Sequence, residues 1–394
     1  QDTTRPVTNA MNVMIAVGER LPELAGAMLP NVAHDVAFNE LLADKHEGMA
    51  QLTSRAAVRD MIAECNSSLD VVGLNYAESG YPALHSDHPN QVLVGSETFP
   101  ARIGALWPQV AATPYVIGDF TWTGWDYLGE AGLGRPRYPG ASDGFCGKYP
   151  WLTAWCGDID IIGTRRPVSY YREIVFGLRQ RPYAAVRAPG HRNHEVQPHA
   201  WTWSDCTPSW TWNIPPGTRL TVEAYADADE VEFLVNDESV AVVPVGQQLA
   251  CFASAELAYQ PGRLEVVARR AGLEVGRDTL RTTGPVQALR LVAEQSHLSP
   301  DDGALGYLRI ELVDARGDVV PTADLPIQVR VQGPVVLQGL GAARPCTEDS
   351  FLADHCRCFQ GRALAAVRPV GPGVIAVEVN CPGLAPQRAM FQVP

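Results

Sequence analysis

No stretch of the sequence approaches 18 uninterrupted apolar residues, about the length that a transmembrane helix needs. We therefore expect no membrane-spanning helix. Basic residues are also in the minority, since 31 Lys and Arg stand against 44 Asp and Glu, for a net charge of -13. This balance argues against nucleic acid and anionic membranes as the main partner.

The N-terminus lacks the pattern of a secretory signal peptide. Gln1, not Met, opens the sequence, and neither a charged segment nor an apolar one follows it. We therefore expect that the start has been cut, by processing or by truncation. The localisation stays unknown.

Metal-ligand spacing is absent too. The 9 cysteines are scattered apart from Cys356 and Cys358, and a one-residue gap is too tight for a zinc knuckle. The histidines show no ligand spacing either. We assign no metal and expect no cofactor.

Residues 1 to about 180 alternate strand-like runs with helix-like segments. Helical spacing of apolar residues marks Gln51–Cys65 and Pro167–Arg179. The strand candidates are short and rich in Val, Ile or Leu: Arg5–Met14, Asp70–Asn75, Gln91–Gly95 and Tyr115–Phe120. Strands that alternate with helices indicate parallel βα units.

From about residue 182 the pattern changes to period two, as in Leu220, Val222 and Ala224. Turn residues separate these runs, which predicts β-sandwiches. The connection 282–285, Thr-Thr-Gly-Pro, divides the region into two modules of ordinary domain size. The 35 Gly and 31 Pro suit such a turn-rich architecture.

Polar and aromatic residues follow three of the strand candidates. The second ends at Asn75-Tyr76, the third at Ser96-Glu97, and the fourth runs into Trp122–Tyr127. A sugar site needs a carboxylate to attack the anomeric carbon, polar groups for the ring hydroxyls, and aromatic faces for the C–H surfaces. These strand ends supply all three.

Four stretches closely resemble the glycoside hydrolase family 2 enzymes, the β-galactosidase and β-glucuronidase group: DVVGLNYAESGY, NQVLVGSETF, YVIGDFTWTGWDYLGE and GDIDIIGTRRPVSYYR. The resemblance extends upstream through DTTRPVTNAMN and downstream through PHAWTW, VEFLVNDESV, DDGALGYLRIELVDARGDVVP and GRALAAVR. It covers essentially the whole chain.

The resemblance implies a multidomain fold. Residues 1–180 would form the second half of a (β/α)8 TIM barrel, strands 5 to 8. Residues 182–284 would form a β-sandwich, and 285–394 an immunoglobulin-like sandwich. The implied activity is that of a retaining exo-β-glycosidase, β-galactosidase-like, which hydrolyses a β-linked sugar by double displacement. A homo-oligomer is compatible with the resemblance.

Individual site residues follow from the same resemblance. Glu97 matches the nucleophile, at the end of the seventh barrel strand. Tyr76 matches the tyrosine that orients this carboxylate, and Asn75 lies where a polar group meets the sugar.

Aromatic residues after the last barrel strand extend the implied sugar site. Trp122 matches a tryptophan of the subsite floor, and Trp125 and Asp126 follow it as further substrate-binding candidates. For Trp125, simple packing is an equal alternative. Core or interdomain packing is what we expect for four later tryptophans: Trp201, Trp203, Trp210 and Trp212.

The second carboxyl of a retaining enzyme is missing from this pattern. In the family the acid/base Glu lies in an Asn-Glu motif before the strand that is matched here by Arg5–Thr8. The one Asn-Glu pair of the chain, Asn39-Glu40, follows that strand, and we interpret it as solvated surface. We therefore expect that the N-terminal half of the same polypeptide is absent and that the isolated chain has negligible activity.

Two alternatives stay open. One is β-glucuronidase or another specificity of the same family, because the loops that choose the sugar lie mostly upstream. The other is a non-catalytic carbohydrate-binding or structural module.

Overall fold

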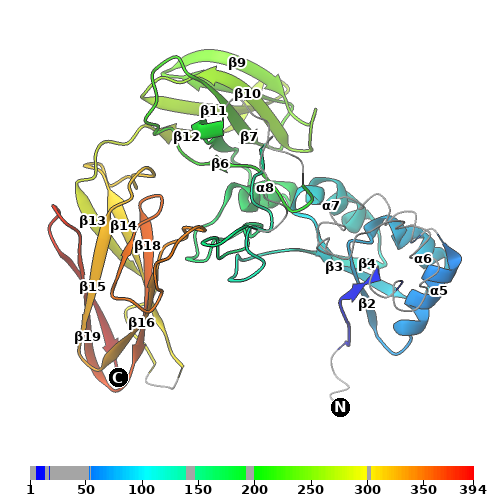
Figure 1. The fold of residues 1–394 in the computed structure, drawn as a ribbon. Coiled ribbons are helices and arrows are strands. Elements are labelled where there is room, and N and C mark those ends of the chain that lie inside the picture. Colours follow the sequence, from blue (N-terminus) through cyan, green and yellow to red (C-terminus); the bar gives the residue numbers. More distant parts are fainter. Residues whose placement is uncertain are drawn as a thin grey trace.

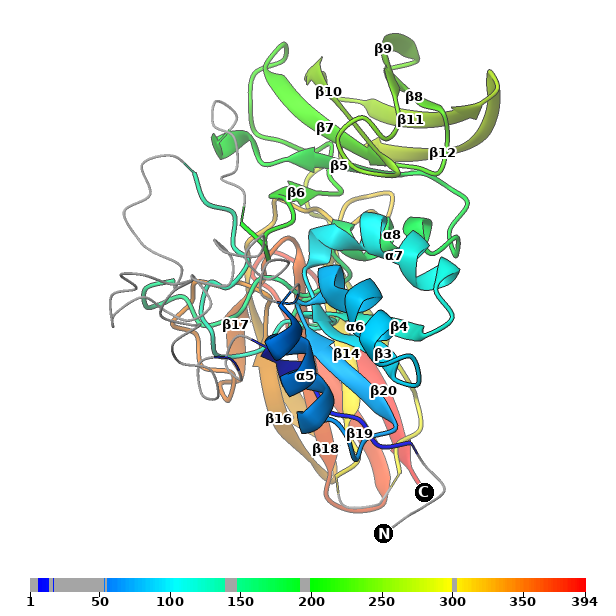
Figure 2. The ribbon, with the colours of Figure 1, turned by 90° about the vertical axis from the view of Figure 1, so that its right-hand side faces the viewer.

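The computed structural model describes residues 6–13, 17, 53, 55–138, 147–191, 199–299 and 303–394. Figure 1 shows three parts: an N-terminal part with helices, a middle β-rich part and a C-terminal β-rich part. The middle part lies above the other two, and Figure 2 shows the same arrangement after a turn of 90°.

A four-stranded parallel sheet in the order β1-β2-β3-β4 organises the N-terminal part. Its strands are β1 (Met11–Asn12), β2 (Val71–Asn75), β3 (Val92–Thr98) and β4 (Val116–Thr121). The last three coincide with strand-like runs of the sequence. β1 falls within the expected strand Arg5–Met14, whose two end residues lie outside the described residues.

Helices connect and flank these strands: α5 (Ala56–Cys65), η1 (Glu78–Gly80), α6 (Tyr81–Asp87), η2 (Pro100–Arg102) and α7 (Ile103–Ala112). α8 (Pro167–Val175) and η3 (Pro189–His191) follow later in the chain, after β4. The predicted helix Pro167–Arg179 was too long. α8 ends at Val175 because Gly177, with a φ of 73°, turns the chain and its N–H returns to the Ile174 carbonyl. The start of the predicted helix Gln51–Cys65 lies outside the described residues, as do Asn39 and Glu40.

One apolar core joins the sheet to its helices. Leu74 of β2 and Leu93 of β3 are fully buried against Ile62 of α5 and Leu84 of α6. Trp201, far along the chain, completes this core. The N-terminal part is therefore packed against the segment that enters the middle part.

The middle part consists of two four-stranded antiparallel sheets, β10-β7-β5-β6 and β12-β11-β8-β9. The first comprises β5 (Tyr183–Arg187), β6 (Cys206–Thr207), β7 (Arg219–Tyr225) and β10 (Phe252–Ala258). The second comprises β8 (Glu230–Val235), β9 (Glu238–Pro244), β11 (Arg263–Arg270) and β12 (Leu273–Arg281). Alternate residues of β7, such as Leu220 and Val222, fill the core between them.

The C-terminal part repeats this plan with sheets β13-β14-β18-β16 and β17-β15-β19-β20. The first comprises β13 (Ala288–Ala293), β14 (Gly306–Val313), β16 (Val335–Gly341) and β18 (Arg362–Pro369). The second comprises β15 (Pro326–Gln332), β17 (His355–Arg357), β19 (Gly373–Asn380) and β20 (Gln387–Val393). The prediction of all-β sandwiches after the helical region is therefore confirmed.

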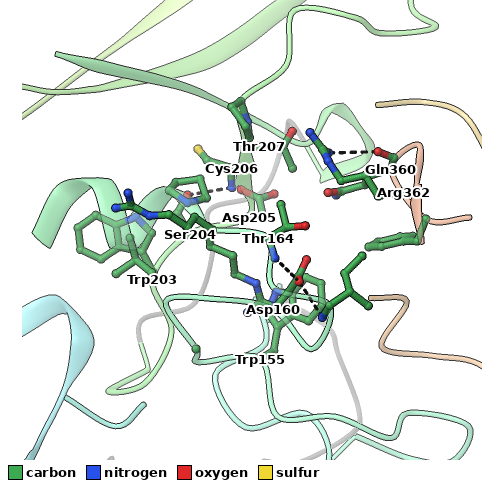
Figure 3. A pocket seen from close by; sticks show the side chains of 18 of the residues that line it. Trp155, Asp160, Thr164, Trp203, Ser204, Asp205, Cys206, Thr207, Gln360 and Arg362 are labelled. Atoms are coloured by element: carbon green, nitrogen blue, oxygen red, sulfur yellow. Dashed lines mark hydrogen bonds between the residues drawn. The ribbon is translucent and has the colours of Figure 1, made fainter. Parts of the chain in front are cut away.

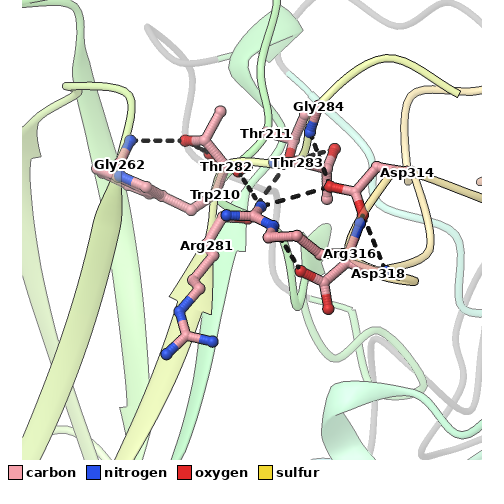
Figure 4. A network of polar contacts seen from close by, with 10 residues as sticks. All are labelled: Trp210, Thr211, Gly262, Arg281, Thr282, Thr283, Gly284, Asp314, Arg316 and Asp318. Atoms are coloured by element: carbon pink, nitrogen blue, oxygen red, sulfur yellow. Dashed lines mark hydrogen bonds and ion pairs between the residues drawn. The ribbon is translucent and has the colours of Figure 1, made fainter. Parts of the chain in front are cut away.

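A polar clamp holds the connection between the two sandwiches (Figure 4). The hydroxyl of Thr282 donates to the Trp210 carbonyl at 2.7 Å, within the middle sandwich. From the C-terminal sandwich, Arg316 donates to the Thr282 carbonyl at 2.8 Å, and Asp314 accepts from the Gly284 N–H at 2.9 Å. The connection is thus bonded to both sandwiches.

Among the described helices, none is long and apolar enough to cross a membrane.

Candidate active site

The ends of β2 and β3 bring three predicted site residues together. Because the strands are parallel, their carboxyl ends lie at one edge of the sheet. Asn75 is paired with Glu97 in the strand register, and the Tyr76 N–H donates to the Glu97 carbonyl at 2.7 Å. The three side chains therefore start from adjacent backbone positions.

The Glu97 carboxyl is partly buried and accepts hydrogen bonds from Tyr76 and Asn75. Burial raises the pKa of Glu97, and the two hydrogen bonds lower it because they stabilise the ionised form. The nearby charge of Glu130 raises it again. A carboxylate that is held by two donors, and shielded from much of the water, is suited to attack a carbon centre.

Asn75 is buried, with 6% of its surface exposed, and its side chain is fixed from the other side. The hydroxyl of Ser96 donates to Asn75 Oδ1 at 2.7 Å. With its oxygen engaged in this way, the amide N–H group is directed to Glu97. Asn75 is therefore oriented by a residue of the same strand that carries Glu97.

Tyr76 is held in an unusual backbone conformation, with a φ of 55°. Its ring stacks on Phe99 with centroids 4.3 Å apart and meets Trp201 edge-on. The indole Nε1 of Trp201 donates to the Tyr76 hydroxyl at 3.1 Å. Since the hydroxyl oxygen accepts from Trp201, its own proton is available for Glu97.

Trp122 follows the end of β4 and begins a second chain of contacts. Its Nε1 donates to the Tyr127 hydroxyl at 3.1 Å, and Tyr127 in turn donates to Glu130. The backbone N–H of Trp122 donates to the Thr98 carbonyl at 3.0 Å, which fixes this loop to the end of β3. The loop that contains Trp122, Tyr127 and Glu130 therefore affects Glu97 through the charge of Glu130.

Trp125 and Asp126 make no contact with Glu97 among the described interactions, and they differ from each other in exposure. Trp125 is exposed, with 53% of its surface accessible, and its backbone pairs with Ile159. Asp126 is buried, forms an ion pair with Arg166 and accepts from the Gly157 N–H at 2.8 Å. These contacts favour a structural role for Asp126, whereas the Trp125 ring is open to solvent.

The loop after Asp126 is held by two further carboxylates, those of Asp158 and Asp160. Asp158 accepts from Arg172 at 2.7 Å. Asp160 accepts from the N–H groups of Ile162 and Thr164 and closes a tight turn.

The chain is similar to several known proteins. Glycoside hydrolase family 2 C-terminal domain 5 matches residues 289–390. A domain of unknown function, DUF4982, matches residues 217–276. β-Galactosidase BoGH2A of Bacteroides ovatus is 23% identical over 362 residues, 80% of this chain and 38% of that protein. A solved glycosyl hydrolase family 2 member from Bacteroides cellulosilyticus matches with a TM-score of 0.75 and 27% identity, over 91% of this chain and 48% of that one.

The chain is thus similar to the C-terminal portion of glycoside hydrolase family 2 proteins. A proposed β-glucuronidase of Formosa agariphila is also similar, with 26% identity over 238 residues, 58% of this chain and 19% of that protein. The chain thus spans less than half the length of each of these relatives.

Three members of the site were not identified from the sequence: Trp201, Tyr127 and Glu130. Trp201 was expected only to pack, and it does pack, with 2% of its surface exposed. No spacing rule could place its N–H at Tyr76, which is 125 residues away. Tyr127 and Glu130 lie within a stretch that resembles the family, so their position after Trp122 was the available signal.

Proposed function

We propose that this chain is the C-terminal part of a retaining exo-β-glycosidase, β-galactosidase-like, in which Glu97 is the nucleophile. The observation that carries the proposal is the position of the Glu97 carboxyl, at the end of a parallel strand between the donors Tyr76 and Asn75. Similarity to glycoside hydrolase family 2 proteins supports a glycosidic bond as the target.

The proposed reaction has two steps. A Glu97 oxygen attacks the anomeric carbon, the bond to the leaving oxygen breaks, and a second carboxyl group protonates that oxygen. The same carboxyl group, now ionised, takes a proton from water, which displaces Glu97 from the glycosyl ester and restores both residues. Tyr76 and Asn75 hold the Glu97 carboxylate in position, and Trp122 provides an aromatic face for the sugar.

We propose that the acid/base and the remaining barrel strands belong to an N-terminal half of the same polypeptide. The short coverage of the relatives supports this, as do the two edges of the parallel sheet at β1 and β4. Ile117 and Phe120 of β4 are 60% and 65% exposed, which fits strands and helices that a complete (β/α)8 barrel would cover. "Complete enzyme" below means this chain joined to that half.

The proposed domain division is 1–180 for the half barrel, 182–284 for the first sandwich and 285–394 for an immunoglobulin-like one. The parallel sheet with α6 and α7 between its strands supports the first unit. The clamped connection at Thr282–Gly284 supports the boundary between the other two.

Sugar choice is the second part of the proposal. The β-galactosidase among the relatives favours a galactoside, and β-glucuronidase is the alternative because a relative carries that name. A panel of nitrophenyl β-glycosides on the complete enzyme decides between them. Saturable sugar binding without turnover of any member would instead favour a non-catalytic carbohydrate-binding module.

Azide rescue tests the role of Glu97. In the complete enzyme, Glu97→Ala removes the nucleophile and leaves room for azide, which attacks the opposite face of the anomeric carbon from the leaving group. We expect activity on a dinitrophenyl β-galactoside to fall by at least about 10³-fold and to recover with azide, giving the α-galactosyl azide. Retention of activity without azide would contradict the proposal, and Glu238→Gln, an exposed carboxylate of β9, is the matched control.

A further inference from the structure

A cavity of about 670 Å³ lies where the three parts of the chain meet (Figure 3). Its walls come from the segment between Trp155 and Val168, from the entry to the middle sandwich at Trp203–Pro208, and from the C-terminal sandwich around Arg309–Glu311 and Phe359–Ala363. Of the residues placed around Glu97, Trp201 alone is among the described residues that line it. The cavity is therefore separate from the carboxylate and its donors.

Aromatic rings on its walls are held in fixed orientations. Trp203 donates from Nε1 to the Tyr225 hydroxyl at 2.9 Å and packs against the Tyr171 ring, with the two ring planes inclined by 35°. Trp155 has one face covered by the Arg166 guanidinium, 3.7 Å from the ring centroid. Both tryptophans remain partly exposed, so they offer pre-oriented apolar surface to a ligand.

One carboxylate oxygen on the same walls lacks a donor. Tyr138 donates to one oxygen of Asp205, while the other, Oδ1, is buried with no hydrogen-bond partner among the described residues. Burial also raises the pKa of Asp205. A buried acceptor of this kind is stabilised when a ligand hydroxyl donates to it.

The guanidinium of Arg362, on the wall from the C-terminal sandwich, has no carboxylate partner among the described residues. Its Nη1 donates to the Gln360 carbonyl at 3.3 Å. Burial lowers the pKa of Arg362, although Glu311 and Asp160 raise it. Thr207, whose hydroxyl makes no hydrogen bond among the described residues, also lines the cavity (Figure 3).

We propose that this cavity binds a neutral carbohydrate as a second sugar site, apart from Glu97. One sugar ring carries hydroxyls that donate to Asp205, oxygens that accept from Arg362, and C–H faces that pack on tryptophan. An anion would meet Asp160, Asp205 and Glu311, and a cation would meet Arg362 with its neighbours Arg166 and Arg309. The volume lies within the range of about 300–1,000 Å³ for small-molecule sites.

Calorimetric titration of the 394-residue chain with lactose tests the proposal. We expect saturable binding that Asp205→Asn and Arg362→Gln each weaken at least about tenfold, or 1.4 kcal/mol. Glu97→Gln and Trp122→Ala should change the Kd less than about twofold, and sodium phosphate should not displace lactose. Azide rescue depends on the other site, so either proposal can fail without the other.

A melting curve shows whether each cavity variant is folded. If a variant fails to fold, Thr207→Val is titrated in its place. Native-like cavity variants that bind lactose as tightly as the parent chain would overturn the proposal. So would absence of binding by lactose, cellobiose and maltose up to about 10 mM, a concentration that corresponds to less than about 3 kcal/mol of binding free energy. Loss of binding in Glu97→Gln alone would assign the sugar to the Glu97 site and would equally overturn it.

Discussion

Trp201 and Tyr76, 125 residues apart, are joined by a hydrogen bond of 3.1 Å from the indole Nε1 to the phenol oxygen. Tyr76 passes this orientation on to Glu97, to which it donates. Trp201, in the segment that enters the middle sandwich, is therefore connected to the proposed nucleophile Glu97 through one side chain, that of Tyr76. If Glu97 is the nucleophile, this contact links the segment that enters the sandwich to the proposed reaction.

Replacement of Trp201 by Phe tests this link. The ring still packs on Tyr76 and Phe99, but the donor is lost, so the tyrosine hydroxyl is free to rotate. We expect kcat of the complete enzyme to fall about 3- to 10-fold, with a stability loss of about 1 kcal/mol. The control is Trp210→Phe, which also removes a buried indole donor, to the Gln260 carbonyl at 2.8 Å, but in the sandwich core. If both variants lower kcat equally, the link is refuted.

Tyr76→Phe removes the hydrogen bond that lowers the pKa of Glu97. The nucleophile must be ionised, so activity falls as the pH drops through this pKa. Loss of the bond therefore moves the acid limb of the kcat/KM profile to higher pH. We also expect kcat to fall about 10- to 100-fold, as for a hydrogen bond to a charged group. Tyr81→Phe is the control, because the buried Tyr81 hydroxyl has no hydrogen-bond partner in the described part of the chain.

Glu130→Gln should move the acid limb of the kcat/KM profile to lower pH. The charge of Glu130 raises the pKa of Glu97, so its neutralisation lowers that pKa. Glutamine still accepts from Tyr127, which keeps the loop in place. The measurement is the pH dependence of kcat/KM, with Glu238→Gln as an exposed control. A shift to higher pH would show that Glu130 acts by another route.

Asp126→Asn should act on stability. It leaves the largely buried Arg166 without its anionic partner, which costs about 3–5 kcal/mol in comparable cases. Denaturant unfolding measures the loss, and the double variant Asp126→Asn/Arg166→Met should recover much of it. Glu256→Gln breaks the exposed pair with Arg219 and should change the free energy of unfolding by less than about 1 kcal/mol. An equally small effect of Asp126→Asn would refute its structural role.

The sequence was sufficient to predict the strands that carry the site. β2 and β3 are short apolar runs, and parallel strands must end at one edge, so the neighbourhood of Asn75 and Glu97 followed from pattern alone. The β-sandwiches followed from the alternation that buries residues such as Leu220 and Val222.

Contacts between distant segments could not be predicted in the same way. Periodicity identifies a buried face but not its partner, so Trp201 was expected to pack without its bond to Tyr76 being foreseen. The buried ion pair of Asp126 depends on how the loop folds back to Arg166, 40 positions later. The end of α8 was misplaced because apolar spacing continued past Gly177, whose positive φ stops the helix.

Mechanism-based labelling tests the central claim most directly. The complete enzyme is treated with a 2-fluoro-β-galactoside that bears a good leaving group, and the trapped glycosyl ester is located by peptide mapping. We expect one label per chain, on Glu97, and none in Glu97→Gln. A label on Glu130 or on any other carboxylate would contradict it.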